Sequence, residues 1–234
     1  DLKSMIFVHL GAGAGDLDGG ANFRCGVTEF IKKNSKSSDK IFLIEANPKN
    51  IPKLKSCYKK FPNAKIFNLG ITTKRERKLK FFYTEDDAPH YQVCTTRKNH
   101  LKKHYPNSQI KTFSISTITI NEFLKKKVKS KIIDCLSIDL EGMDYESIMS
   151  INIKKKIIEN ISIEFIHMNK FQKKNMINHL TKNGYSYAGY GYDHNNFDLL
   201  FVRKKIFLNR ILSKLIWLIS IKYLKFLNYL ISAK

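Results

Sequence analysis

The sequence contains few cysteines, and no two of them stand at metal-binding or redox spacing. The four cysteines are scattered along the 234 residues, at Cys25, Cys57, Cys94 and Cys135. Without a C-x-x-C pair, the chain carries neither a zinc-module signature nor a thioredoxin-like redox motif. Free structural cysteines are typical of a reducing compartment. The chain also opens without a signal-peptide pattern, so we expect a cytoplasmic protein.

Acidic residues are scarce relative to basic ones. The chain has 42 lysine and arginine residues against 20 aspartate and glutamate residues, which gives a formal charge of +22. Such an excess favours an anionic partner. The lysines are nevertheless spread over almost every segment, and no arginine-rich or aromatic–basic module is recognisable. We therefore expect an anionic or membrane-surface partner more than a nucleic acid.

No apolar run is long enough to cross a bilayer, which takes roughly 20 consecutive apolar residues. The C-terminal segment, residues 205–234, comes nearest, but its longest uncharged stretch spans only residues 215–221. Leucine, isoleucine and aromatic residues interrupted by lysine and arginine predict a basic amphipathic helix there. Such a helix is typical of an anchor on an anionic membrane, which would place the protein on the inner face. A helix packed on the domain and a dimer contact are equally open, and the oligomeric state is not determined by the sequence.

What the sequence does contain is an alternation of short apolar runs with polar stretches of helix length. The runs occupy residues 5–10, 40–46, 64–71, 133–142 and 161–167. Continuous apolar strands separated by helices predict a mostly parallel sheet buried on both faces, which is the α/β doubly wound class. Two further runs, residues 185–192 and 197–203, are separated only by "DHNN", which predicts a closing antiparallel hairpin strand. We expect one domain over residues 1–204.

An irregular insertion, about residues 83–114, breaks this alternation. It carries paired acids and three histidines, His90, His100 and His104, whose spacing is loose. Insertions at strand ends commonly cover the ligand crevice of such a sheet, so His90 and Tyr91 are predicted substrate contacts. A solvated surface excursion fits the composition as well. Because of the loose spacing, we expect no essential metal.

A glycine-rich loop follows the first strand. Gly11, Gly13 and Gly15 form G-x-G-x-G, but the sixth place of the dinucleotide fingerprint is occupied by Asp16. A carboxylate there would oppose a pyrophosphate at the helix terminus, so a loop that admits a nucleoside without its phosphates fits better.

Acidic residues stand at the carboxyl ends of the neighbouring strands. Glu45, followed by Asn47, ends the second strand, where a carboxylate can accept hydrogen bonds from two ribose hydroxyls. The fourth strand ends in Asp139, Glu141 and Asp144 around a glycine. Three acids at one strand end repel one another unless they are divided between tasks, so we expect one or two of them to face the crevice.

The motifs "VHLGAGAGD", "IEANP", "IDLEGMD" and "ISIEFIH", in this order on successive strands, resemble the FkbM-type S-adenosylmethionine-dependent methyltransferases. The resemblance covers residues 5–203. It implies a Rossmann-like fold, S-adenosylmethionine as methyl donor, and O-methylation of a sugar, glycan or glycolipid-type hydroxyl.

The resemblance also implies roles for individual residues. Gly11, Gly13 and Gly15 would form the cofactor loop and Glu45 the ribose acceptor, with Asn47 beside it. Asp139, Glu141 and Gly142 would match the D-x-E-G signature, and Glu164 the acid of the next strand. His9 stands where the family usually has aspartate, which changes how the methionine amino group is held, and Asp16 is a predicted compensation.

Methyl transfer to a hydroxyl needs a group that accepts the proton. His167, after the fifth strand, is the predicted base. The alternatives are His90 in the insertion and the carboxylates of Asp139 and Glu164, and Glu141 is a predicted substrate contact. Three other functions stay open on the sequence alone: a nucleic-acid methyltransferase, a catalytically silent S-adenosylmethionine-binding protein and a nicotinamide oxidoreductase. The first lacks an N/D-P-P-Y motif, and Asp16 argues against the last.

Overall fold

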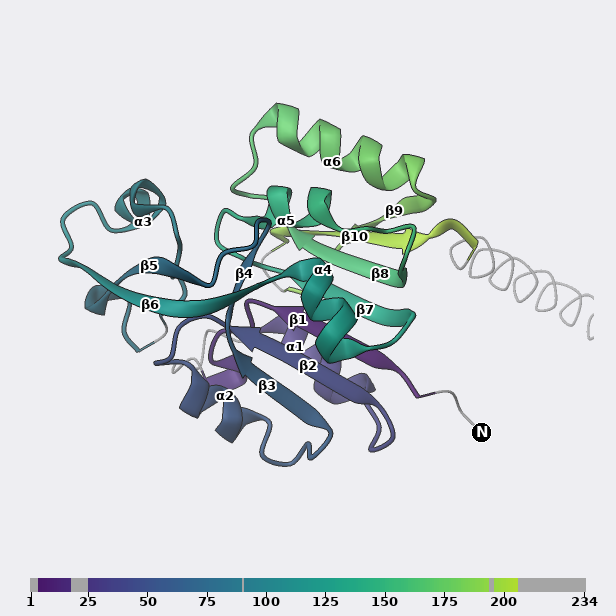
Figure 1. Ribbon diagram of the computed structural model, residues 1–234, viewed down its shortest axis with the longest axis horizontal. Helices are drawn as coiled ribbons and strands as arrows, with labels where there is room; N and C mark the ends of the chain where they lie inside the picture. The colour runs from purple at the N-terminus through teal and green to yellow at the C-terminus, as the bar shows by residue number, and fades with distance from the viewer. Residues whose placement is uncertain (1–3, 18–24, 90, 194–195, 206–234) are drawn as a thin grey trace, which may run out of the picture.

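The computed structural model describes residues 4–17, 25–89, 91–193 and 196–205 of the chain. Its centre is a seven-stranded sheet of order β3-β2-β1-β7-β8-β10-β9 (Figure 1). The strands, in that order, are Ala64–Asn68, Lys40–Glu45, Ile6–Leu10, Ile132–Ile138, Ile157–Glu164, Asp198–Arg203 and Tyr185–Tyr190. All neighbouring pairs are parallel except the two that involve β10. The doubly wound, mostly parallel sheet with a closing antiparallel strand is confirmed.

The sheet is buried on both faces because its apolar runs alternate between two cores. In β1, Ile6 and Val8 pack into one core and Phe7 into the other. The helices α1 (Gly26–Asn34) and α2 (Ile51–Cys57) contribute to the core that contains Phe7. The opposite core is covered by α4 (Ile120–Phe123), α5 (Asp144–Ser150) and α6 (Lys170–Lys182). Because helices cover both faces of the sheet, a ligand crevice is expected at the carboxyl ends of the parallel strands.

A second sheet that the sequence analysis missed holds the middle of the chain. Its order is β4-β6-β5, with bounds Gly70–Thr72, Ile110–Thr119 and Lys78–Thr84. The insertion predicted as irregular therefore begins inside β5 and ends inside β6, which pair antiparallel. Between them lie the short helix α3 (Lys98–His104) and a 3-10 turn, η2 (Glu85–Asp87). In Figure 1 this arm extends to the side of the central sheet, toward the strand ends.

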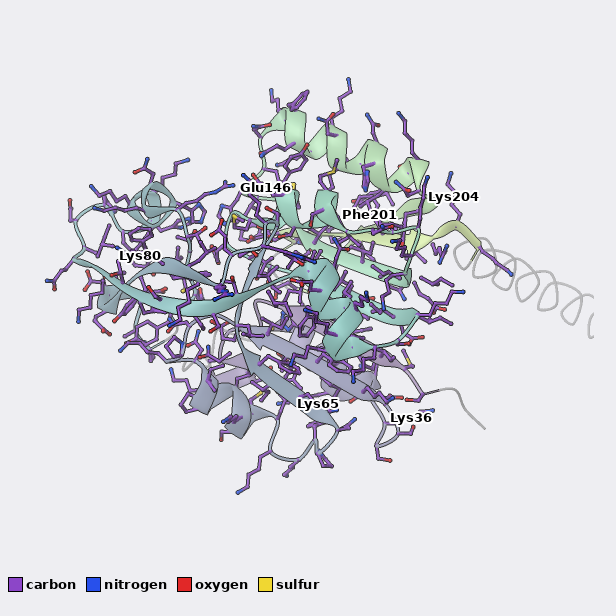
Figure 2. All side chains as sticks on the ribbon, viewed as in Figure 1. Lys36, Lys65, Lys80, Glu146, Phe201 and Lys204 are labelled. Atoms are coloured by element: carbon purple, nitrogen blue, oxygen red, sulfur yellow. The ribbon has the colours of Figure 1, made fainter. Side chains whose placement is uncertain are left out.

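The basic residues are dispersed over the surface. In Figure 2, Lys36, Lys65, Lys80 and Lys204 point outward from different elements of the fold, and all four are exposed. No helix within the described ranges is long and apolar enough to cross a membrane. The predicted amphipathic helix of residues 205–234 lies, except for its first residue, outside the described part. Its association with a membrane therefore stays a prediction.

Candidate active site

A cavity of about 330 Å³ opens at the carboxyl ends of the central strands. Side chains or backbone from the ends of β1, β2, β7 and β8 line it, and segments between β5 and β6 contribute Tyr91, Val93, Cys94, Thr96 and His104. The insertion thus covers the crevice, as one of the two interpretations of its composition predicted. A volume of this size is at the lower end of that of small-molecule sites.

The glycine loop divides between the cavity and the packing behind it. Gly11 and Gly13 line the cavity, whereas Gly15 packs on α2, where a Cβ would lie 2.7 Å from the Cys57 sulfur. Asp16, predicted to act at the cofactor, instead forms a 2.6 Å ion pair with Lys32 and is not among the lining residues. The close approach of Gly15 to α2 explains its lack of a side chain without reference to a ligand.

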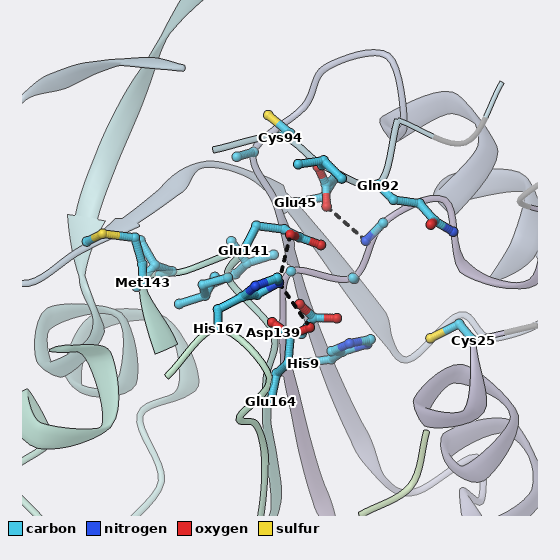
Figure 3. Close-up of a pocket in the computed structure, with 18 of the residues that line it drawn as sticks. His9, Cys25, Glu45, Gln92, Cys94, Asp139, Glu141, Met143, Glu164 and His167 are labelled. Atoms are coloured by element: carbon cyan, nitrogen blue, oxygen red, sulfur yellow. Dashed lines mark hydrogen bonds and ion pairs between the residues drawn. The ribbon is translucent and has the colours of Figure 1, made fainter. Parts of the chain in front are cut away.

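Glu45 organises the loop as well as lining the cavity. One carboxylate oxygen accepts a hydrogen bond of 2.8 Å from the Gly13 amide (Figure 3). The other oxygen accepts one of 2.6 Å from the Asn47 amide. Asn47 itself is buried outside the cavity lining, and its carboxamide oxygen accepts from the Lys49 amide. The carboxylate of Glu45 therefore fixes the distance between the first two strand ends.

Two of the three acidic residues after β7 face the cavity, in agreement with the expectation that one or two of them would. Asp139 and Glu141 line the cavity, while Asp144 accepts hydrogen bonds from the Leu140 and Gly142 amides at 2.7 and 3.1 Å. Asp144 thus shapes the loop that presents the other two carboxylates.

Buried carboxylates dominate the floor of the cavity. Burial raises the pKa of Asp139 well above its ordinary value, and the charge of Glu141 adds to the effect. Burial, followed by the charge of Asp139, likewise raises the pKa of Glu164. Beside them His9 is buried, and the loss of hydration lowers its pKa to about 4, so that its imidazole is neutral near pH 7.

Two histidines meet the carboxylates at one wall. The Nε2 atom of His167 lies 3.5 Å from Oε2 of Glu141 and 3.6 Å from Oε1 of Glu164 (Figure 3). The Nε2 atom of His100 lies 3.3 Å from the same Glu141 oxygen. The structure therefore brings together the three predicted catalytic residues, Asp139, Glu164 and His167, at one end of the cavity.

The family follows from the sequence comparison. The methyltransferase FkbM domain matches residues 18–187, well over half of the chain. The chain belongs to the FkbM methyltransferase family. S-adenosylmethionine is accordingly its methyl donor. A search of curated proteins found no match for this FkbM methyltransferase.

Some solved structures resemble the chain at low identity. Fibrillarin from Aeropyrum pernix, crystallised with S-adenosyl-L-methionine, is 10% identical, with a TM-score of 0.43 over 86% of this chain and 66% of that one. Precorrin-6y C5,15-methyltransferase from Geobacter metallireducens is 14% identical, with a TM-score of 0.42 over 87% and 82%. The FkbM methyltransferase spans about two thirds of the length of the fibrillarins that it matches.

The residues predicted to contact the substrate have different outcomes. Tyr91 lines the cavity, and its hydroxyl donates to the carboxylate of Glu85 in the insertion. Glu141 lines the cavity as well. His90 lies outside the described residues, so its predicted role stays untested.

Sequence reasoning missed several residues of the site. Cys25 lines the cavity from the position before α1. Asp193 and Phe197 line it from the connection between β9 and β10, and Asp198 from the first position of β10. Asp198 lies opposite Glu164 because β10 pairs antiparallel with β8, a pairing that the predicted hairpin did not specify. Nothing in the spacing of Cys25 indicated its position at the cavity wall.

Proposed function

We propose that this FkbM methyltransferase transfers the methyl group of S-adenosylmethionine to a hydroxyl of a sugar, glycan or glycolipid-type acceptor. The observation that carries the proposal is the acidic lining of the cavity. Six carboxylates line it and, among the described residues, no lysine or arginine does. The six acidic residues are Glu45, Asp139, Glu141, Glu164, Asp193 and Asp198. In a protein of charge +22 these acidic groups favour a cationic ligand, whose charge would promote the ionised forms that burial disfavours at Asp139 and Glu164. The same groups oppose a pyrophosphate.

The residues present fit S-adenosylmethionine. Three polar atoms of the cavity side chains are buried and have no hydrogen-bond partner within the described part of the chain: Nδ1 of His9, Oδ1 of Asp139 and Oε2 of Glu164. Buried polar atoms are normally paired, so these three call for ligand groups. Asp139 and Glu164 would hold the positively charged end of the cofactor. They would thereby replace the aspartate that usually stands at the position of His9 in this family. Gly11, Gly13 and Glu45 would hold its nucleoside.

The acceptor hydroxyl would lie at the wall formed by His167 and Glu141, next to the carboxylates that hold the cofactor. S-adenosylmethionine supplies a methyl carbon whose bond to sulfur breaks, leaving the electron pair on sulfur, as the bond to the acceptor oxygen forms. The chain's own contribution is to orient the hydroxyl in line with that carbon and to receive its proton at this group. The side chains of His167 and Glu141 are 15% and 19% exposed, so the hydroxyl is largely shielded from water.

The proposal predicts which acceptors are methylated. The full-length protein is incubated with S-adenosylmethionine labelled in its methyl group and with three acceptor classes: sugars and glycolipids, RNA, and small amines. We expect label to enter a hydroxyl-bearing sugar or lipid glycan and to stay base-stable as an ether. Transfer to RNA alone would overturn the proposed acceptor, and cofactor binding without transfer to any class would indicate a silent binding protein.

Removing the charge of Glu45 should weaken cofactor binding. In Glu45→Gln one oxygen becomes an amide donor, which can no longer accept from the Gly13 or Asn47 amide or from a ribose hydroxyl. We expect the dissociation constant of S-adenosylhomocysteine to rise by about tenfold, since a hydrogen bond to a charged group contributes roughly 1.5–3 kcal/mol. Calorimetric titration measures it.

The matched control for this experiment is Glu122→Gln. Glu122 lies in α4, outside the cavity, and its carboxylate interacts with Lys126 and Thr119. Equal affinity of the two variants would contradict the role of Glu45. Protection of the wild-type protein by NAD in place of S-adenosylmethionine would contradict the cofactor assignment itself.

A further inference from the structure

Three histidines from two separate segments meet at the wall of the cavity. His100 and His104 lie four residues apart on α3, and His167 follows β8. The ring centroids of His100 and His104 are 5.0 Å apart, and those of His100 and His167 are 4.3 Å apart. One ligand nitrogen from each of the three imidazoles lies within 4.8 Å of the other two. Residues four apart on a helix point to the same side, so α3 presents both of its histidines to His167.

Glu141 supplies a fourth donor atom from the loop after β7. A single oxygen, Oε2, lies 3.3 Å from Nε2 of His100 and 3.5 Å from Nε2 of His167. Four donors at the roughly 2.0–2.1 Å bond lengths of a tetrahedral zinc site lie about 3.4 Å from one another. Both distances from the Glu141 oxygen therefore already match the separation of adjacent ligands, and His104 offers a ligand nitrogen within 4.8 Å of those of His100 and His167.

The backbone that presents Glu141 is held in an unfavourable conformation. Its φ is +47°, in the left-handed region that a residue with a Cβ adopts only at an energetic cost. The insertion stabilises this conformation: the Thr95 hydroxyl donates a hydrogen bond of 3.1 Å to the Glu141 carbonyl oxygen, and Arg97 pairs with Glu146 at 2.7 Å. Strain that the surroundings maintain in this way is typical of functional sites.

We propose that His100, His104, His167 and Glu141 bind one divalent transition-metal ion of the zinc class. Imidazole nitrogens suit zinc, cobalt and nickel, whereas magnesium and calcium prefer a shell of oxygens. The sequence led us to expect no essential metal because only the histidines of the insertion were considered together. The partner that completes the group is His167, which the fold brings to α3 from the far end of β8.

The task of this ion rests on the proposed function. His104, Glu141 and His167 line the cavity, and His104 is exposed, so an ion held there stands where the acceptor hydroxyl approaches. Coordination to a cation lowers the pKa of a hydroxyl, whose proton then passes to water. With the ion bound, His167 is a ligand rather than a free base, and the ion makes the acceptor oxygen nucleophilic.

The test is metal binding by the full-length protein without cofactor. Zn²⁺ is titrated in competition with a chromophoric chelator, and Co²⁺ is titrated as a spectroscopic probe. We expect one equivalent of each ion and the visible absorption of four-coordinate Co²⁺. His100→Asn and His104→Asn should each weaken Zn²⁺ binding by more than the roughly 10–100-fold that loss of an outer-shell partner costs. His179→Asn, a histidine on α6 outside the group, serves as the matched control and should leave the affinity unchanged.

Binding of S-adenosylhomocysteine, measured in parallel, shows that each variant is folded. The proposal is overturned if the wild-type protein binds no stoichiometric ion, or if His100→Asn and His104→Asn bind Zn²⁺ as tightly as the control. An intense thiolate-to-Co²⁺ band in the near ultraviolet would place the ion on cysteines and would overturn it as well. Metal binding without methylation of any hydroxyl leaves this site standing and refutes the proposed function. Undiminished methylation in a strong chelator leaves the proposed function standing and refutes the task of the ion.

Discussion

Replacing Gly11 with alanine is expected to lower the free energy of unfolding by about 3–4 kcal/mol, which is a large effect for one methyl group. A Cβ on Gly11 would lie 1.6 Å from the carbonyl oxygen of Asp139, and Gly11 has a φ of +81°. The ends of β1 and β7 would have to separate. That movement breaks the 3.0 Å hydrogen bond from the Asp139 amide to the Leu10 carbonyl oxygen and strains that from the Gly11 amide to Ile44. The positive φ alone costs roughly 1–2 kcal/mol, and each lost hydrogen bond about 1 kcal/mol.

Gly184→Ala separates the strain of the backbone from the clash. Gly184 also has a positive φ, of +87°, but a Cβ there would meet nothing within 4 Å. Urea denaturation of both variants should therefore show a loss of roughly 1–2 kcal/mol for Gly184→Ala, from strain alone, and a much larger loss for Gly11→Ala. Equal losses would mean that the strand ends yield at little cost and that the close approach of Gly11 to Asp139 does not hold the cavity together.

This interpretation of Gly11 shows what the glycine loop could and could not reveal in the sequence. Three glycines after a strand predicted a close backbone approach, and the approach exists. In two of the three positions, however, the neighbour is the protein itself: the Asp139 carbonyl for Gly11 and the Cys57 side chain for Gly15. A sequence motif indicates that a side chain is excluded, but it does not say whether a ligand or another segment excludes it.

The central sheet was predictable because burial on both faces requires long apolar runs. β1, β2, β7 and β8 are almost wholly buried, and each one stands out as such a run. The strands β5 and β6 are mostly half-buried or exposed, so polar residues alternate with apolar ones, and both were taken as part of an irregular segment. The missed sheet therefore reflects its solvent exposure.

Part of the candidate site was also predictable from the sequence, and part of it was not. Glu45, Asp139 and Glu164 end strands of a parallel sheet, so their order along the chain places them at one edge. The encounter of α3 with His167 depends on contacts between distant segments, such as that of Thr95 with Glu141, which no local spacing encodes. Sequence reasoning could thus name the acids of the cavity but not the histidine group that faces them.

Two buried groups of the cavity should give opposite pH dependences of stability in the same pH range. Burial lowers the pKa of His9 from 6.5 to about 4. As the pH falls from 6.5 to 4, His9 becomes protonated in the unfolded chain but stays neutral in the folded protein, so the folded state loses stability. Burial, opposed by the Ser162 hydroxyl and aided by the charge of Asp193, raises the pKa of Asp198 from 3.8 to about 6. As the pH rises from 4 to 6, the unfolded chain releases that proton first, and the folded state again loses stability.

The measurement is the free energy of unfolding of the wild-type protein, His9→Asn and Asp198→Asn at several pH values between 4 and 7. Each pKa unit corresponds to about 1.4 kcal/mol, so each effect amounts to on the order of 3 kcal/mol across the range. Stability of the wild-type protein relative to His9→Asn should rise with pH, whereas its stability relative to Asp198→Asn should fall. Parallel slopes would contradict the burial of one of the two groups. Opposite slopes would show that, between the two pKa values, the folded protein keeps the His9 imidazole neutral and the Asp198 carboxyl group protonated. A cationic cofactor would then favour the ionised form of Asp198 when it binds.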